Sequence, residues 1–244
     1  MKQKNNQITH SKKLEKLPIW NLKDLYISKN SKEIQKDLSF LMKNTRSFEK
    51  HYFKKVTKLK APQIYVAIQK LEKIDLIIDK ILSYAHLLMA EDGNNEKNKI
   101  FYQQMQEKIN KFYSSVIFFT LELNQISEKK LSKLLKNKIL LKYENWIKNK
   151  RNLKPYQLDL KIEKLLQDKS ITSNNAWIRL FDDTITSLKF PFKNEKLTSA
   201  EIFNLLSDKK RYVRKSAAKS IGNVLKSNIK IFSTITNTLA KDKE

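Results

Sequence analysis

The sequence predicts an all-α fold, and two observations support this prediction. Only 2 Gly and 4 Pro occur in 244 residues, so turn-forming residues are scarce and long helices joined by few loops are favoured. Two apolar stripes with helical spacing lie between Pro62 and Leu123, on either side of a polar turn. No fixed-period repeat is present, so a solenoid is not supported. We expect a long antiparallel helical hairpin plus further packed helices, with at most one short extended segment.

The hairpin is the clearest predicted element. Its apolar residues follow one another at spacings of three and four, which places them on one face of each helix. Gly93, in the turn Asp92–Asn95, suits the left-handed position that closes a helix. Two such stripes predict two long helices with a coiled-coil-like seam over residues 62–123, and the aromatic residues of the second stripe are expected in the core. The first stripe is Ile64, Ala67, Leu71, Ile74, Ile78, Ile81, Ala85 and Leu88, and the second is Phe101, Met105, Ile109, Phe112, Val116, Phe119 and Leu123.

The region before the hairpin begins with a polar segment. Residues 1–16 are predicted to be a flexible polar arm, and a short ordered segment, 17–20, follows it. A helix is expected to begin after Asn30-Ser31, where Ser31 can cap it, and to run to about Lys58. Pro62 is well placed as the first residue of the next helix.

The region after the hairpin is predicted to be helical as well, apart from one piece. Residues 189–192 include Pro191, which moves Phe190 away from helical geometry and indicates a short extended segment. Thr198–Glu201 is a capping box that announces a further helix. The other helices are expected at about 127–137, 139–151, 156–168, 174–188, 208–226 and 228–241.

Composition excludes several classes of protein. There is no Cys, which rules out disulfides, thiolate zinc sites and a Cys nucleophile. The polar N-terminus has no apolar core of the kind a secretory signal needs. The longest uncharged stretch, 112–121, is far shorter than the roughly 20 apolar residues of a membrane-spanning helix. We therefore expect a cytoplasmic protein that is not embedded in a membrane.

The net charge of +25 raises the question of nucleic acid. Binding to nucleic acid favours clustered basic residues, and arginine above all, because its forked guanidinium matches phosphates and base edges. Only five arginines are present, so 45 of the 50 basic residues are lysines, and most are dispersed among Asp and Glu. A solvated lysine-rich surface explains this pattern better than a nucleic-acid site does. No nucleic-acid partner is expected.

Catalytic chemistry is not visible in the sequence. A helical zinc site needs two His one turn apart with a neighbouring Glu, but His10, His51 and His86 are far apart and none lies in such a frame. Two glycines cannot supply a phosphate-binding loop or a nucleophile elbow. The carboxylate pairs Glu91-Asp92 and Asp182-Asp183 are interpreted as exposed helix-end charges. We assign no catalytic, cofactor-binding or metal-binding residue to this chain.

Six segments nevertheless resemble, in order and with compatible gaps, motifs of the oligoendopeptidase F family of zinc peptidases, which is related to thimet oligopeptidase. Each motif is weak alone, because tryptophans and leucines at helical spacing are usually core residues. Together they are distributed over nearly the whole chain from Leu17 onward, and the likeness is greatest to alphaproteobacterial members. The segments are Trp20–Tyr26, Leu82–Ala85, Phe118–Asn124, Glu163–Leu166 with Ala176–Asp182, Asp208–Ala217, and Ile235–Glu244.

The resemblance implies a specific architecture and activity. Members of the family are cytoplasmic zinc endopeptidases that cleave short peptides inside a deep channel between an N-terminal helical region and a C-terminal catalytic region. The zinc is held by two His of an H-E-x-x-H motif and a downstream Glu, and the Glu of the motif activates water. No position of this chain matches those residues. The resemblance therefore implies an N-terminal helical domain at 17–227, and the start of a catalytic region at 228–244.

These predictions lead to one expectation about function and leave two alternatives. We expect the channel-forming part of an oligoendopeptidase, inactive alone and without zinc, whose partner is the catalytic half in the same polypeptide or as a split product. The apolar pattern of the last helix continues to Leu239 without a stop signal, so a fragment, a split-gene product and a decayed gene all remain open. The face bearing Ile231, Phe232, Ile235 and Leu239 is expected to lack a cover. The alternatives are a basic helical nucleic-acid-binding protein and a non-enzymatic helical scaffold.

Overall fold

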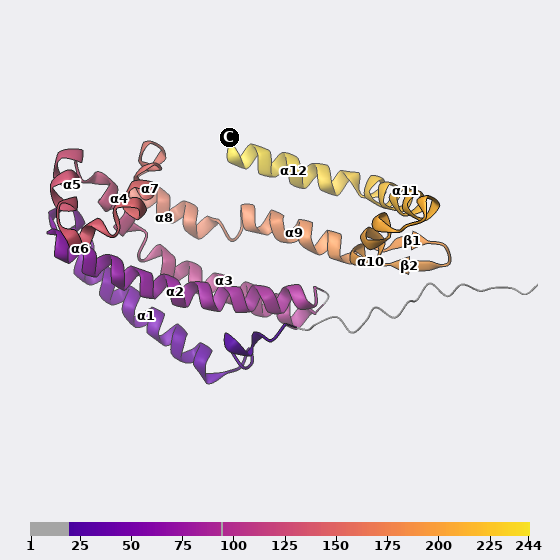
Figure 1. Ribbon diagram of the computed structural model, residues 1–244, viewed down its shortest axis with the longest axis horizontal. Coiled ribbons are helices and arrows are strands. Elements are labelled where there is room, and N and C mark those ends of the chain that lie inside the picture. Colours follow the sequence, from indigo (N-terminus) through magenta and orange to yellow (C-terminus); the bar gives the residue numbers. More distant parts are fainter. Residues whose placement is uncertain (1–19, 94) are drawn as a thin grey trace, which may run out of the picture.

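A computed structural model describes residues 20–93 and 95–244 of the chain. The predicted polar arm at 1–16, most of the short segment at 17–20 and His10 lie outside the described residues. The described part is all-α apart from one small hairpin of two strands, which confirms the predicted fold class (Figure 1). One expectation about it was wrong, because two short strands are present and at most one extended segment was expected.

The elements follow one another in the order shown in Figure 1. Single turns of 3-10 helix lie at Leu22–Asp24, Val56–Lys58, Lys154–Tyr156 and Leu205–Ser207. The helices and strands are α1 (Lys32–Tyr52), α2 (Ala61–Glu91), α3 (Glu96–Ser114), α4 (Phe118–Gln125), α5 (Glu128–Leu135), α6 (Lys138–Leu141), α7 (Glu144–Arg151), α8 (Leu160–Lys169), α9 (Asn174–Ser187), β1 (Phe190–Phe192), β2 (Glu195–Leu197), α10 (Ser199–Asn204), α11 (Arg211–Ser227) and α12 (Ile229–Lys243).

The predicted hairpin is formed by α2 and α3, which lie side by side (Figure 1). Ile74, Ile78 and Val116 are buried, as the stripes require, and Phe112 is partly buried against the same core. The second helix, however, does not run on to Leu123 as predicted. It ends at Ser114, and a turn at 115–117 redirects the chain into α4.

The break after α3 is explained by the aromatic residues that follow it. The backbone N–H of Val116 and that of Phe119 donate to carbonyls three residues earlier, so the turn tightens before α4 begins. This bend lets α4 place its two phenylalanines on α1, where the ring of Phe118 lies 5.3 Å from that of Phe53 and the ring of Phe119 lies 5.3 Å from that of Phe48. The stripe kept its spacing across the bend, so periodicity alone could not reveal it.

Helix α1 also ends earlier than predicted, at Tyr52 instead of about Lys58. The chain turns at Lys54, whose φ of 60° is in the left-handed region that ends helices. A lysine gives no sequence signal for this conformation, which glycine usually adopts. Gly93, by contrast, was predicted to adopt the left-handed conformation and does not, because its φ is not positive. A Cβ at Gly93 would lie 2.9 Å from Cγ2 of Thr186 in α9, so this glycine is required by close contact instead.

The second half of the chain follows the predicted order with shifted boundaries. The single helix expected at 139–151 is two helices, α6 and α7, and the one expected at 156–168 begins only at Leu160, after a 3-10 turn. The helix expected from 208 begins at Arg211. Strands β1 and β2 pair antiparallel, with Phe190 opposite Leu197. The predicted capping box is present, since the backbone N–H of Thr198 donates to Glu201 Oε2 at 2.8 Å and that of Glu201 donates back to Thr198 Oγ1.

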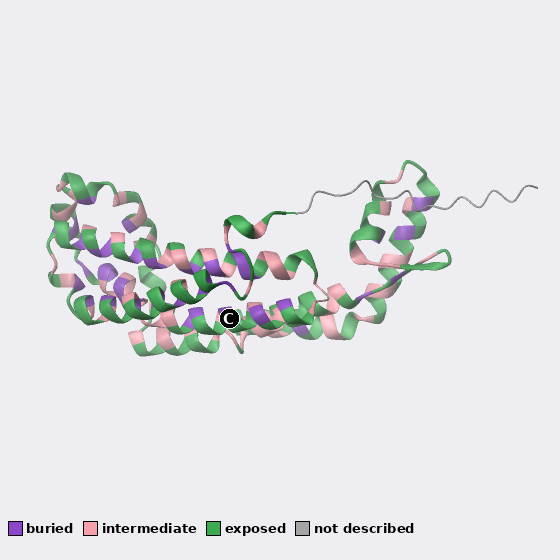
Figure 2. Cartoon of the chain, turned by 90° about the horizontal axis from the view of Figure 1, so that it is seen from below, coloured by how far each residue is buried: buried purple, intermediate pink, exposed green. Residues whose placement is uncertain are grey.

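Two separate apolar cores result (Figure 2). The first is built from α1 to α7 with the segment around Tyr26, and its members end in sequence at Leu160. The second, smaller core begins at Ile185 and joins the end of α9 with the strands, α10, α11 and α12. Its fully or nearly buried members are Leu188, Phe190, Ile202 and Ala217.

The apolar face of α12 is covered within the chain, which overturns the expectation that it would face water. Helix α12 lies along α9 (Figure 1), and the ring of Phe232 meets that of Phe181 at 5.8 Å. Ile235 is only 2% exposed, and Ile231 and Leu239 are half-buried. The predicted boundary between residues 227 and 228 coincides with the joint between α11 and α12, but its meaning as a domain boundary stays a prediction.

Candidate functional surface

The first two motifs of the family resemblance meet in the fold. Tyr26 of the first motif and Tyr84 of the second are both buried, and their rings pack edge to face at 5.3 Å. The hydroxyl of Tyr26 donates to Asp37 Oδ2 at 2.7 Å, and burial with this carboxylate raises the pKa of Tyr26. Trp20, by contrast, is exposed. These tyrosines therefore hold the segment before α1 against the hairpin and do no visible chemistry.

The third motif supplies a carboxylate that shapes the backbone. Glu122 in α4 accepts the backbone N–H of Lys54 at 2.6 Å and that of Val56 at 3.1 Å. Both donors lie in the turn that ends α1, so one carboxylate satisfies two backbone groups at a helix end. The later motif residue Arg214 acts similarly on α11, since its Nη1 donates to the backbone oxygens of Asp208 and Lys209. These two charged motif residues thus hold backbone groups at helix ends.

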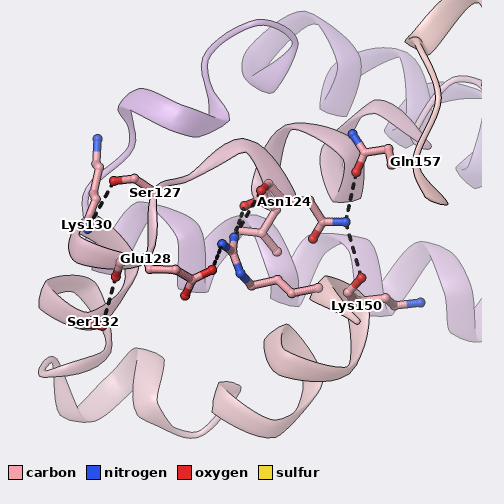
Figure 3. Close-up of polar contacts among 9 residues, drawn as sticks. Asn124, Ser127, Glu128, Lys130, Ser132, Lys150 and Gln157 are labelled. Atoms are coloured by element: carbon pink, nitrogen blue, oxygen red, sulfur yellow. Dashed lines mark hydrogen bonds and ion pairs between the residues drawn. The ribbon is translucent and has the colours of Figure 1, made fainter. Parts of the chain in front are cut away.

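A polar node joins α4 to α7 and to the chain that enters α8 (Figure 3). Nδ2 of the buried Asn124 donates to the backbone oxygen of Lys150 at 3.3 Å and to Gln157 Oε1 at 3.1 Å. Nη1 of Arg151 donates to the carbonyls of Leu123 and Asn124 at the end of α4, and Nη2 pairs with Glu128. These contacts fix the direction in which α8 leaves the first core.

Helices α8 and α9 then run end to end between the two cores (Figure 1). No described residue from 161 to 184 belongs to either core. We call α8 and α9 the bridge. Its apolar residues have helical spacing, which in sequence looks like a core stripe, yet their exposed fractions run from 39% at Leu180 to 60% at Leu165. The exposed apolar residues of the bridge are Ile162, Leu165, Leu166, Ile178, Leu180 and Phe181.

Exposed apolar side chains in such number are unusual on an ordinary solvated surface. Single exposed apolar residues need no explanation, but contiguous patches mark sites of protein–protein or ligand contact. Leu165 and Leu166 follow Ile162 on α8 at spacings of three and four, so all three lie on one side of that helix. The bridge is the strongest candidate functional surface in the described chain.

Charged groups line the side of the bridge that meets the hairpin. Lys99 Nζ in α3 lies 2.9 Å from Asp183 Oδ1 in α9, and this contact raises the pKa of Lys99. Burial, together with the neighbouring Asp183, raises the pKa of Asp182, and the nearby His86 opposes that effect. The interpretation of Asp182 and Asp183 as helix-end charges was wrong, because both lie within α9 and Asp183 forms an ion pair between elements. Glu91-Asp92 does lie at the end of α2.

The described histidines are separated and hold no metal-like arrangement. His51 is exposed near the end of α1 and its Nδ1 lies 2.7 Å from the backbone oxygen of Ser47. His86 is exposed on α2 and stacks near the ring of Tyr102 at 5.6 Å. Within residues 20–93 and 95–244, no three His, Cys, Asp or Glu side chains gather as a metal ion would need. The donor set of the described chain therefore does not fit zinc.

A hollow on the described surface offers no reactive group either. A concavity of about 670 Å³ lies among α5, α6 and α7, with Leu131, Leu135 and Leu141 along its wall. The carboxylates at its rim are already paired, Glu128 with Arg151 and Glu144 with Lys148. It is a polar-rimmed depression without a nucleophile and base in contact.

Fold and surface together define a helical module with an exposed apolar bridge. Comparison with known proteins adds its lineage. Residues 122–190 match the family model described as Oligopeptidase F, and this match supports the resemblance to the N-terminal portion of an oligoendopeptidase F family protein. The matched range begins at Glu122 and contains the whole bridge. Neither the comparison with curated proteins nor that with solved structures gives a match.

No helix in the described part of the chain is both long and apolar enough to cross a membrane.

Proposed function

We propose that this chain forms the helical, channel-forming N-terminal part of a cytoplasmic zinc-dependent oligoendopeptidase that hydrolyses short peptides. The observation that carries the proposal is the exposed bridge, which lies wholly inside the segment that matches the family model. In this proposal the catalytic region, in the same polypeptide or as a separate chain, docks on the bridge and supplies zinc and its ligands.

The described side chains indicate which role in the proposed enzyme belongs to this chain and which belongs to the catalytic region. The chain offers backbone clamps and apolar surface, and its described carboxylates and histidines fit no zinc site. In the proposed assembly, hydrolysis depends on residues of the catalytic region. Its own part is to form a wall of the channel and so to limit the size of the substrate.

The proposal is tested by reconstitution. The isolated chain should hold no stoichiometric zinc by metal analysis and should leave quenched short peptides uncut. Mixing it with a separately expressed catalytic region that carries H-E-x-x-H should give a complex and zinc-dependent cleavage of short peptides, but not of a folded protein. One tightly held zinc per isolated chain, or peptide cleavage by that chain alone, would contradict the proposal.

The role of the bridge is tested by matched variants. Ile162→Gln with Leu165→Gln removes two exposed apolar side chains from α8, and we expect it to weaken binding of the catalytic region. Each exposed anchor that is buried on binding contributes about 1.5–3 kcal/mol, which is roughly tenfold or more in affinity. The control is Leu76→Gln with Ile139→Gln, which makes the same chemical change at exposed sites on α2 and α6. Equal weakening by both pairs would remove the bridge from the interface.

A further inference from the structure

The two apolar cores share no side chain, so the chain between them determines how one core can move relative to the other. The first core contains described residues only as far as Leu160, and the second begins at Ile185. Packed cores are stiff because their side chains interlock at high density. Relative motion is therefore expected where neither core reaches, within the bridge.

Helix α8 is attached to the first core at both of its ends. Leu160 packs on that core, and Lys164 Nζ lies 3.3 Å from Glu49 Oε1 of α1. Near its C-terminus, Asn110 of α3 and Gln167 form a reciprocal pair, in which Asn110 Nδ2 donates to the backbone oxygen of Gln167 at 3.1 Å and Gln167 Nε2 donates to Asn110 Oδ1 at 2.5 Å. Helix α8 therefore moves with the hairpin.

Helix α9 is attached differently. Its end packs into the second core, and its middle meets α12 through Phe181 and Phe232. Its contacts with the hairpin include the Lys99–Asp183 ion pair and the close approach of Thr186 to Gly93, and Asp182 lies near His86 and Tyr102. Asp183 is 56% exposed, so water and salt reach the ion pair.

The chain between α8 and α9 is a non-helical turn at residues 170–173. Ser173 has φ −103° and ψ −114°, outside the helical region, so the helix axis is interrupted there. Such a short element-terminal segment can absorb the dihedral changes of a hinge.

We propose that residues 174–244 form a rigid arm that swings about the turn at 170–173, and that Lys99–Asp183 with the Gly93–Thr186 contact is a salt-sensitive latch that holds the arm against the hairpin. In the latched state the exposed apolar residues of α8 and those of α9 keep one fixed arrangement. In the released state α9 moves relative to α8, and that arrangement is lost. On the proposed function, the latch thus sets whether the catalytic region meets the whole bridge or α8 alone.

The latch is weak enough to open. Exposed ion pairs contribute little, so we expect Asp183→Asn to raise the ratio of open to latched arm about two- to fivefold, which corresponds to about 0.4–1 kcal/mol. Raising the salt concentration to about 1 M should act in the same direction, because the screening length then falls to about 3 Å. Glu195→Gln is the matched control, since it removes one exposed carboxylate from the arm away from the latch.

Distances between two spin labels measure the motion directly. The chain has no Cys, so introduced cysteines are the only thiols. Labels at Gln104→Cys on α3 and Ser216→Cys on α11 report on the arm, and labels at Gln104→Cys and Lys43→Cys report on the first core alone. The first pair should show a distribution that broadens in Asp183→Asn and at high salt, while the second pair and Glu195→Gln stay unchanged. A first-pair distribution that is insensitive to both changes would overturn the proposal.

A disulfide trap gives an independent readout. A Cβ at Gly93 would lie 3.8 Å from the Cβ of Thr186, which is the usual separation in a disulfide. Gly93→Cys with Thr186→Cys should therefore oxidise readily when the arm is latched, and more slowly, by at most about two- to fivefold, when Asp183→Asn is added. Circular dichroism verifies that the reduced variants are folded. A folded variant that forms no disulfide, or one whose oxidation rate ignores Asp183, would overturn the latch.

Discussion

The carboxylate of Glu122 accepts the backbone N–H of Lys54 at 2.6 Å, across 68 residues of sequence. The same carboxylate accepts the N–H of Val56 at 3.1 Å, so it fastens the turn between α1 and α2 to α4. Hydrogen bonds to a charged acceptor contribute more than neutral ones do, about 1.5–3 kcal/mol.

Replacing this carboxylate should therefore weaken the first core. Glu122→Gln leaves a single acceptor oxygen and turns an amide N–H group toward one of the backbone donors. We expect the free energy of unfolding to fall by about 1–3 kcal/mol, as measured by urea denaturation. Glu195→Gln, the same substitution at an exposed site, should change it by no more than about 0.5 kcal/mol. A similar effect of both substitutions would mean that the clamp does not stabilise the fold.

A substitution at Lys54 is expected to raise the stability of the fold instead of lowering it. Its φ of 60° costs a non-glycine residue about 1–2 kcal/mol, which exceeds the entropy cost of glycine, about 0.5–1 kcal/mol. Lys54→Gly should therefore raise the melting temperature, with a gain of about 0.5–1 kcal/mol. Lys55→Gly is the control, since Lys55 has φ −124° and glycine gains nothing there. A loss of stability in Lys54→Gly would show that the side chain contributes more than the strain costs.

Asp75 makes stability depend on pH. Burial and the neighbouring Asp79 raise its pKa from 3.8 to about 6, with Glu72 adding to the effect and Lys150 opposing it. The folded state therefore binds this proton more tightly than the unfolded state does. The stabilisation from protonated Asp75 is complete below about pH 4 and is lost as the pH rises through about 6.

Asp75→Asn tests this directly. The variant should be more stable than the natural chain at pH 7.5, by on the order of 1–2 kcal/mol after allowance for partial exposure, and the difference should vanish near pH 4. Asp168→Asn, an equal charge change at an exposed site on α8, should show no such trend. A stability difference for Asp75→Asn that stays constant between pH 4 and pH 7.5 would contradict the raised pKa.

The bridge and α12 should respond oppositely to polar substitution. Ile162→Gln with Leu165→Gln should leave the melting temperature nearly unchanged while it lowers dye binding and self-association, because these side chains already face water. Ile235→Gln should instead cost about 2–4 kcal/mol, because it places a polar group in a site that is only 2% exposed. Sedimentation and thermal melts report both outcomes. Strong destabilisation by the bridge variant would mean that this face is covered.

Local patterns in the sequence were sufficient to predict that the helices exist and which of their residues share a face. The stripe through Ile74 and Ile78 predicted a buried seam, and the Thr198–Glu201 capping box predicted the start of α10. The absence of a recognisable catalytic motif also followed from residue types alone. Order and spacing of motifs indicated the peptidase family, which the match at 122–190 supports.

Such local patterns could not predict where the helices bend or end. The turn after Ser114 keeps the apolar spacing, and Lys54 adopts a conformation that its residue type does not announce, because Glu122 from a distant helix holds it there. Gly93 is a glycine because Thr186 approaches it, which only the packing of α9 against the hairpin reveals.

The sequence by itself determined the all-α class, the hairpin and the family resemblance, because amphipathic periodicity and short-range capping are written in neighbouring residues. The tertiary structure alone decided which apolar stripes are buried. The stripes of α8 and α12 look alike in sequence, yet Ile235 is buried against α9 while Leu165 faces water. Helical spacing specifies which residues share a face, but only the packing of distant elements determines what that face meets.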